Sequence, residues 1–293
     1  MARTRTSAGK RLRRWLMQSA LLYYSVACWV YLIDALPLGF ARFLGRCGGR
    51  LAYYLDWGHR AIALNNLAIA FPEKDRAEHL RILKACYVHL GLLVVDFCKC
   101  KSLTADDVRT WIVPEDGALD RMNAAKAQNK GIIAVSAHIG SWELAGFAFP
   151  TLGFPAVSIA RKIVSDRIEA LVHHIRTRLG NEVVHKEGAL RHMLRAFKEK
   201  KALGIIMDQH AGNDSPWIPF FGREASTVDS VARLHIRTGA PAMFNVMIRR
   251  PDGKYTWRSR TIQIPPPRTE QSEDERVREI LIACNREMED AIR

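Results

Sequence analysis

The spacing of hydrophobic residues changes near Pro114 and divides the chain into two parts. Before Pro114, apolar residues recur at intervals of three and four, as in the run H-L-R-I-L-K-A-C-Y-V-H-L-G-L-L-V-V-D-F at residues 79–97. Residues 39–101 are therefore predicted to be helical, with one segment ending at Pro72 because proline cannot continue a helix. Beyond Pro114, short apolar runs alternate with segments of helical spacing, so strands and helices are predicted to alternate.

This alternation predicts an α/β fold with a central, mainly parallel sheet flanked by helices. The predicted strands are 132–137, 156–160, 182–184, 202–208 and 241–250. The predicted helices that accompany them are 141–148, 166–180, 189–198, 227–240 and, after a proline-rich turn at 265–267, 271–292. In such sheets the reactive groups gather just beyond the carboxyl ends of the strands, and His138 and Asp208 both occupy such positions.

The first residues combine a basic cluster with an uncharged apolar stretch. Six Lys and Arg side chains precede Trp15, and the 18 residues from 16 to 33 carry no charge, which is the lower limit for crossing a hydrocarbon core. A secretory signal is disfavoured because no small-residue cleavage site follows, and a buried core helix would leave the basic cluster without a purpose. Membrane attachment is favoured, either as a single span or as a helix lying in the interface.

The charge balance adds a constraint on the partners of the protein. A net charge of +14 and an isoelectric point near 9.8 favour an anionic partner, which can be nucleic acid, a lipid headgroup surface or an acidic carrier protein. No recognised nucleic-acid-binding motif accompanies the charge, so nucleic acid is not expected to be a partner. The six cysteines include no C-x-x-C pair and no zinc-ligand spacing, which predicts free thiols on the cytoplasmic side.

The apolar run that ends at His138 is followed five residues later by Glu143. With Ser141 as the N-cap of the next helix, Glu143 would lie in the first helical turn and could face the loop that carries His138. A carboxylate that accepts one imidazole N–H fixes the tautomer and leaves the other nitrogen as a base. Neither Ser136 nor Ser141 lies in a G-x-S-x-G elbow, so the hydroxyl that loses its proton is assigned to a substrate.

These motifs resemble those of the lipid A biosynthesis (late) acyltransferase family, of the lauroyl and myristoyl transferase type, within the lysophospholipid acyltransferase superfamily. H-x-x-x-x-E after a strand resembles the first motif of glycerolipid-type acyltransferases. The segments that carry the resemblance are N-N-L-A-I-A-F-P at 65–72, K-G-I-I-A-V-S-A-H-I-G-S-W-E at 130–143, A-R-K at 160–162, I-R-T-R-L-G at 175–180, I-I-M-D-Q-H at 205–210, P-F-F-G-R-E-A-S-T-V at 219–228 and R-T-G-A-P at 237–241.

The resemblance implies a membrane-bound O-acyltransferase. It would move a fatty acyl chain from acyl carrier protein or acyl-CoA to a hydroxyl of a membrane glycolipid, a lipid A precursor or a similar lipid, with neither a metal nor another cofactor. His138 would be the general base and Glu143 its orienting partner. The residues implied to hold the acceptor phosphate, the donor or the oxyanion are Arg161, Arg176 and Asp208. Arg178 competes with Arg176 for the same motif position.

The same resemblance implies a location and a domain organisation. The enzyme would work at the cell inner membrane, with its catalytic domain on the cytoplasmic face and an anionic membrane surface as a partner. Residues 1–38 would form the basic N-terminus and a membrane-anchoring helix. Residues 39–293 would form the acyltransferase domain, with a helical lead-in at 39–113 and the α/β catalytic core at 114–293.

Three alternatives concern residues outside the histidine motif. The loop S-P-W-I-P-F-F-G at 215–222 forms either an apolar wall for an acyl chain, which its place after Asp208 favours, or part of the core. The histidines at 173, 174, 185 and 192 are assigned to a basic helical face rather than to a metal site, because neighbours on a helix point in different directions. A catalytically silent membrane protein that binds anionic lipid is the alternative to an enzyme, and the His138–Glu143 pair favours the enzyme.

Overall fold

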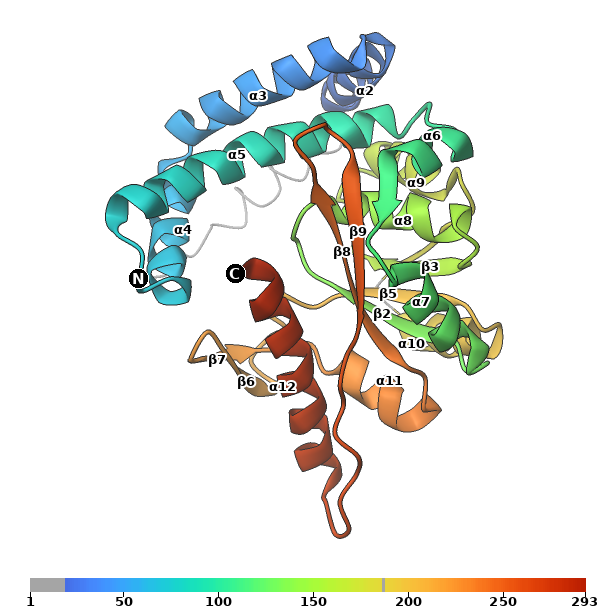
Figure 1. The fold of residues 1–293 in the computed structure, drawn as a ribbon. Helices are drawn as coiled ribbons and strands as arrows, with labels where there is room; N and C mark the ends of the chain where they lie inside the picture. Colours follow the sequence, from blue (N-terminus) through green and yellow to red (C-terminus); the bar gives the residue numbers. More distant parts are fainter. Residues whose placement is uncertain (1–18, 186–187) are drawn as a thin grey trace.

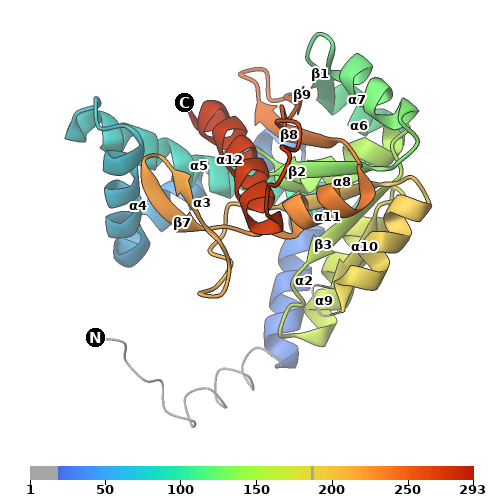
Figure 2. The same ribbon diagram turned by 90° about the horizontal axis from the view of Figure 1, so that it is seen from below.

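The computed structural model describes residues 19–185 and 188–293. In this part of the chain, seven strands form one sheet in the order β1-β9-β8-β2-β5-β3-β4, with helices on both faces (Figures 1 and 2). The strands are β1 (Ile112–Pro114), β2 (Ile132–Ser136), β3 (Ala156–Ala160), β4 (Glu182–His185), β5 (Ala202–Ile206), β8 (Ala242–Arg249) and β9 (Tyr255–Thr261). A separate antiparallel hairpin is formed by β6 (Trp217–Phe220) and β7 (Arg223–Ser226).

The predicted α/β class and the mainly parallel sheet are confirmed. β8, β2, β5, β3 and β4 pair in parallel, whereas β9 runs antiparallel to β8 and β1 pairs in parallel with β9. The strands β1, β6, β7 and β9 were not predicted from the sequence. Along β9, Tyr255, Trp257 and Ser259 are buried and alternate with polar, more exposed residues, which is the period-two pattern of a strand.

Helices on the two faces of the sheet create two hydrophobic cores. One core includes α8 (Trp142–Thr151), and the other includes α10 (Ala189–Lys198), α11 (Ser230–Thr238) and α12 (Glu273–Ile292). Ile132 and Ala134 of β2 belong to the first core, and Ile133 and Val135 belong to the second. β2 is therefore buried on both faces, which explains why it reads as a continuous apolar run. The helices α6 (Ala105–Trp111), α7 (Ala118–Ala127) and α9 (Asp166–Thr177) complete this part of the chain.

The first three helices of the predicted helical lead-in, residues 39–113, are α3 (Leu38–Leu55), α4 (Trp57–Ala70) and α5 (Arg76–Lys99). In Figure 1, α3 forms an outer layer over α5, away from the sheet. Glycines allow this close packing: a Cβ added at Gly45 would lie 2.8 Å from the carbonyl oxygen of Gly91, and one added at Gly49 would lie 2.4 Å from that of Tyr87. A larger side chain at either position would push the two helices apart.

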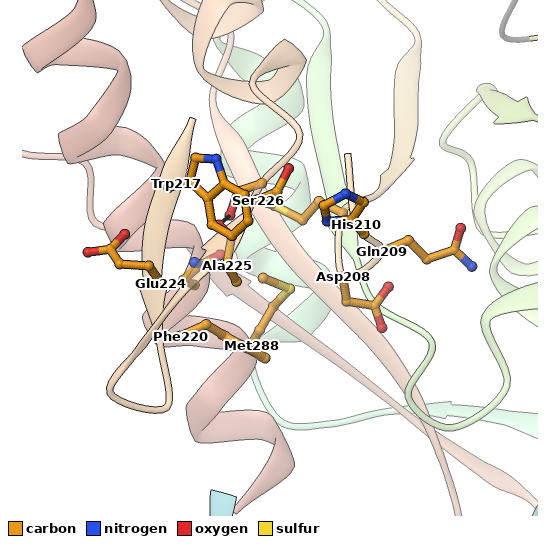
Figure 3. A pocket seen from close by; sticks show the side chains of 12 residues that line it. Asp208, Gln209, His210, Trp217, Phe220, Glu224, Ala225, Ser226 and Met288 are labelled. Carbon is orange, nitrogen blue, oxygen red and sulfur yellow. Dashed lines mark hydrogen bonds between the residues drawn. The ribbon is translucent and has the colours of Figure 1, made fainter. Parts of the chain in front are cut away.

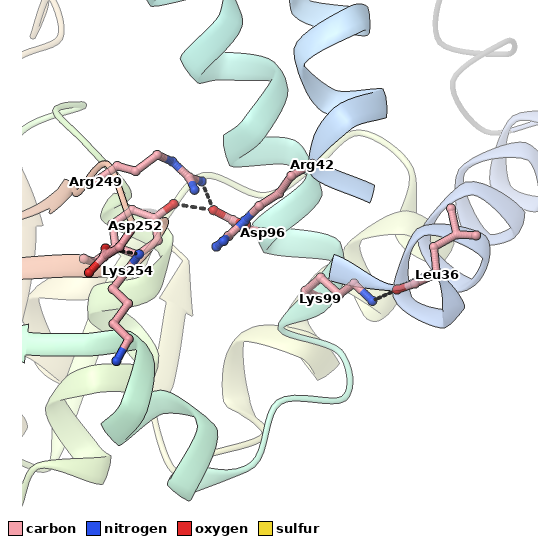
Figure 4. Close-up of polar contacts among 8 residues, drawn as sticks. Leu36, Arg42, Asp96, Lys99, Arg249, Asp252 and Lys254 are labelled. Carbon is pink, nitrogen blue, oxygen red and sulfur yellow. Dashed lines mark hydrogen bonds and ion pairs between the residues drawn. The ribbon is translucent and has the colours of Figure 1, made fainter. Parts of the chain in front are cut away.

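A buried carboxylate connects these helices to the sheet (Figure 4). Asp96 on α5 accepts hydrogen bonds from Arg42 Nε of α3 at 3.1 Å, from Arg249 of β8 and from the hydroxyl of Tyr255 of β9. Burial raises the pKa of Tyr255, and the charge of Asp96 raises it further, so the hydroxyl stays a donor. Two helices and a strand hairpin that is distant from them in the sequence thus meet at one side chain.

The predicted membrane-anchoring helix is not supported by the described residues. The apolar stretch forms α2 (Ala20–Ala35), a helix of 16 residues that packs on α5 and α9 and buries Ala27, Val30 and Ile33. A span needs about 20 residues, and no helix within 19–185 or 188–293 is long and apolar enough to cross a bilayer. One face of the stretch is instead used for packing within the protein. The basic cluster and residues 16–18 lie outside the described residues.

Candidate functional site

His138 and Asp208 are brought together by the pairing of two central strands. β2 and β5 are parallel neighbours, and Ser136 pairs with Ile206 at their carboxyl ends. His138 and Asp208 each lie two residues beyond this pair. Asp208 Oδ1 lies 2.7 Å from His138 Nδ1, and Asp208 Oδ2 accepts a hydrogen bond from the backbone N–H of His138 at 2.8 Å. One carboxylate therefore fixes both the ring and the backbone of the histidine.

This geometry determines the tautomer of His138. An ionised carboxylate can only accept hydrogen bonds, so Nδ1 carries the proton that Asp208 binds and, in the neutral ring, Nε2 is the basic nitrogen. The ring packs edge to face against Trp142, with centroids 4.7 Å apart, and the side-chain amide nitrogen of Gln209 lies 3.5 Å from Nε2. The arrangement can accept a proton at Nε2 while Asp208 stabilises the resulting imidazolium.

The loop after His138 is held by contacts from two other elements. Gly140 has φ +61°, and a Cβ at this position would lie 1.9 Å from the carbonyl oxygen of Met247 in β8. The carbonyl of Gly140 also lies 3.0 Å from Nε2 of His89 on α5, and the N–H of Ser141 donates to Met247 at 2.8 Å. The loop is thus clamped between α5 and β8, and only glycine fits at its centre.

Glu143 was predicted to orient His138, but in the structure it pairs with a different residue. Ser141 is the N-cap of α8, as expected, and Glu143 lies in the first turn. Its carboxylate, however, forms a bidentate pair with Arg176 of α9, at 2.9 Å to Nε and 2.5 Å to Nη2. Burial alone lowers the pKa of Arg176, but the hydrogen bond and charge of Glu143 outweigh it and raise that pKa, so the guanidinium stays charged. The carboxylate that orients His138 in this structure is Asp208.

The remaining predicted residues lie around this centre. Arg161 is exposed directly after β3, at the same edge of the sheet as His138. Arg178, the alternative to Arg176, instead donates to the backbone carbonyls of Cys100 and Lys101 at the end of α5. Of the two arginines, Arg176 is the one that pairs with Glu143, the glutamate of the histidine motif. Among the described residues, no group of three His, Cys, Asp or Glu side chains is arranged to hold a metal ion.

A cavity of about 270 Å³ borders Asp208 (Figure 3). Trp217 and Phe220 of the loop predicted as an acyl-chain wall line this cavity, together with Met288 of α12. His210 faces Trp217 across it, with ring centroids 6.2 Å apart, and Glu224 and Ser226 add polar groups. The volume is slightly below the ~300–1,000 Å³ of typical small-molecule sites. The segment therefore has both predicted roles, because Trp217 and Phe220 line the cavity and Ile218 between them is fully buried in the second core.

Sequence reasoning missed three residues that contact the centre: His89, Trp142 and Gln209. Trp142 precedes Glu143 and Gln209 follows Asp208, so the sequence could have indicated that both lie near the site. His89 lies 51 residues before Gly140 in an ordinary amphipathic helix, and no local pattern distinguishes it from a surface residue.

Comparison with known proteins identifies the family of the chain. A family model described as bacterial lipid A biosynthesis acyltransferase matches residues 9–293. The chain is 27% identical over 219 residues to the lipid A biosynthesis palmitoleoyltransferase of Escherichia coli (strain K12), covering 74% of this chain and 70% of that protein. A lipid A biosynthesis acyltransferase of Haemophilus influenzae is 24% identical over 204 residues, covering 69% of this chain and 63% of that protein. Because the family model spans nearly the whole chain, the protein belongs to the bacterial lipid A biosynthesis acyltransferases and is an acyltransferase enzyme.

Proposed function

We propose that the protein transfers a fatty acyl chain from a thioester donor, acyl carrier protein or acyl-CoA, to a hydroxyl of a lipid A precursor at the cytoplasmic face of the inner membrane. His138 is the general base and Asp208 its orienting partner. The observation that carries this proposal is the hydrogen bond between Asp208 and His138 Nδ1, which leaves Nε2 as the base at the carboxyl edge of the sheet.

The proposed reaction is one proton transfer coupled to one acyl transfer. Nε2 of His138 takes the proton of the acceptor hydroxyl as its oxygen attacks the thioester carbonyl carbon. The carbon–sulfur bond then breaks, and the leaving thiolate takes the proton back from the imidazolium. The charge of Asp208 stabilises the imidazolium between the two steps. No metal ion takes part in this scheme.

The surrounding residues support binding rather than proton transfer. The exposed guanidinium of Arg161 is placed to bind a phosphate of the acceptor, and the cavity beside Asp208 is assigned to part of the donor acyl chain. Glu143 and Arg176 hold the start of α8 against α9 and so support the loop that carries His138. Gln209, next to Nε2, is a candidate donor to the oxyanion.

The test is transfer of a labelled acyl group to a lipid A precursor, with acyl carrier protein and coenzyme A as alternative carriers. His138→Ala should lower the rate about 10²–10⁴-fold, because general base catalysis contributes a factor of that size. His192→Ala, which changes an exposed histidine on α10, is the matched control and should not alter the rate. If the His138→Ala enzyme gives as much product as the wild type, the proposed mechanism is wrong. Lipid binding without any product from the wild type would instead indicate a silent lipid-binding protein.

A further inference from the structure

Helix α3 has two apolar faces, and only one of them is buried in the protein. The inner face consists of Ala41, Gly45 and Gly49, which pack closely against α5, and of the buried Tyr53 near the end of the helix. The contact is so close that α3 cannot rotate without a clash between backbones, as the distances at Gly45 and Gly49 show. The opposite face must therefore stay on the outside of the molecule, where Figure 1 shows α3 as the outer layer.

Large apolar side chains line this outer face. They recur at helical spacing and are followed by the first residue of α4, and between half and three quarters of each residue is exposed. We call this set the outer stripe; its members are Phe40 (52%), Phe43 (51%), Leu51 (59%), Tyr54 (63%), Leu55 (72%) and Trp57 (76%). Proteins rarely expose so many large apolar side chains together unless the surface binds something.

Two arginines flank the outer stripe, and the acidic residue between Leu55 and Trp57, Asp56, already contacts His59 and Tyr87. Arg46 and Arg50 lie along its flank by helical spacing, and α3 contains no Asp or Glu. A second copy of this chain docked on the same stripe would bring these arginines together with no carboxylate of α3 to pair with them. Leucine and aromatic side chains with arginines at their edge instead suit the boundary between acyl chains and anionic headgroups.

We propose that the outer stripe docks on a bilayer that contains anionic lipid, with α3 lying in the interface and not crossing it. The inference rests on the proposed function in one respect: a membrane lipid as the acceptor explains why the enzyme would bind a membrane. α5, on which α3 packs, contacts the loop of the active site through His89 and Gly140. Docking through α3 would thus hold the part of the protein that carries His138 next to the membrane in which the acceptor lies.

Flotation of the full chain with vesicles tests this proposal. Vesicles of phosphatidylethanolamine and phosphatidylglycerol are compared with vesicles of phosphatidylcholine. The double variant Phe43→Glu/Leu51→Glu should bind the anionic vesicles at least tenfold more weakly, because two large apolar groups no longer leave water. The matched control is Leu190→Glu on α10, equally exposed at 58% but remote from the stripe, which should bind like the wild type. Arg46→Gln/Arg50→Gln should weaken binding to anionic vesicles and leave binding to neutral vesicles unchanged.

Activity measurements separate this proposal from the proposed function. The Phe43→Glu/Leu51→Glu enzyme should lose turnover of acceptor in vesicles but keep it with acceptor dispersed in detergent micelles, where docking is not needed. His138→Ala should bind vesicles like the wild type and lose about 10²–10⁴-fold of its turnover with both forms of the acceptor. Unchanged vesicle binding by the double variant would overturn the docking surface. An equal loss of vesicle binding in Leu190→Glu would also overturn it. So would a wild-type protein that is a dimer, if the double variant is a monomer that still binds vesicles normally.

Discussion

Replacing Asp208 with Asn should remove the base while the rest of the site stays in place. Asp208 accepts two hydrogen bonds from His138, from the backbone N–H at 2.8 Å and from Nδ1 at 2.7 Å. An amide has only one acceptor oxygen, and the backbone N–H can only donate, so that oxygen pairs with the backbone. The amide nitrogen then donates to Nδ1 and forces the ring proton onto Nε2, the atom that must be free to accept one.

The expected loss follows from this wrong tautomer. A similar exchange in serine proteases lowers kcat about 10⁴-fold, and general base catalysis is worth about 10²–10⁴-fold. For Asp208→Asn we therefore expect kcat to fall about 10²–10⁴-fold, or about 3–5 kcal/mol of transition-state stabilisation, with KM little changed. Steady-state rates at saturating donor and varied acceptor measure both constants. Asp214→Asn, on the same loop and exposed, is the matched control.

Two outcomes would refute this reasoning. A raised KM with an unchanged kcat would assign Asp208 to substrate binding, as the family resemblance implied. A nearly unchanged Asp208→Asn enzyme, together with a Glu143→Gln enzyme that folds normally but loses turnover, would return the orienting role to Glu143. Because Glu143 pairs with Arg176, we instead expect Glu143→Gln to lower the melting temperature.

Three further predictions concern packing and burial. Asp96→Ala should lower the free energy of unfolding by about 3–5 kcal/mol in urea denaturation, because Arg42 and Arg249 would remain buried without their partner; a loss below about 1 kcal/mol would contradict this. Gly140→Ala should abolish turnover even where the variant folds, since a Cβ would collide with the backbone of β8 and displace His138; a wild-type rate would exclude the clamped loop. Burial raises the pKa of Cys284 to about 12, so iodoacetamide at pH 8 should leave this thiol unmodified in the folded protein and modify it in urea, as mass spectrometry would show.

The hydrophobic pattern predicted the class of fold because local periodicity reports which face of an element is buried. Predicted strands at 132–137, 156–160 and 202–208 correspond to β2, β3 and β5 within a residue or two at each end. The pattern at 255–261 was not recognised, although its alternate burial is that of a strand, because Arg and Thr on the exposed face interrupt the apolar signal. The apolar stretch before Asp34 was predicted to attach to a membrane as a span or as an interfacial helix, and its described part forms α2, whose 16 residues are too few for a span.

The sequence by itself determined which residues stand at the ends of strands, and so it identified His138 and Asp208 as candidates. It could not determine that β2 and β5 are neighbours, because strand order depends on contacts between segments separated by some 70 residues. Only the tertiary structure decided which carboxylate meets His138. Glu143 is close in sequence, but the first turn of α8 directs its side chain to Arg176, whereas the parallel register of two strands places Asp208 beside the ring.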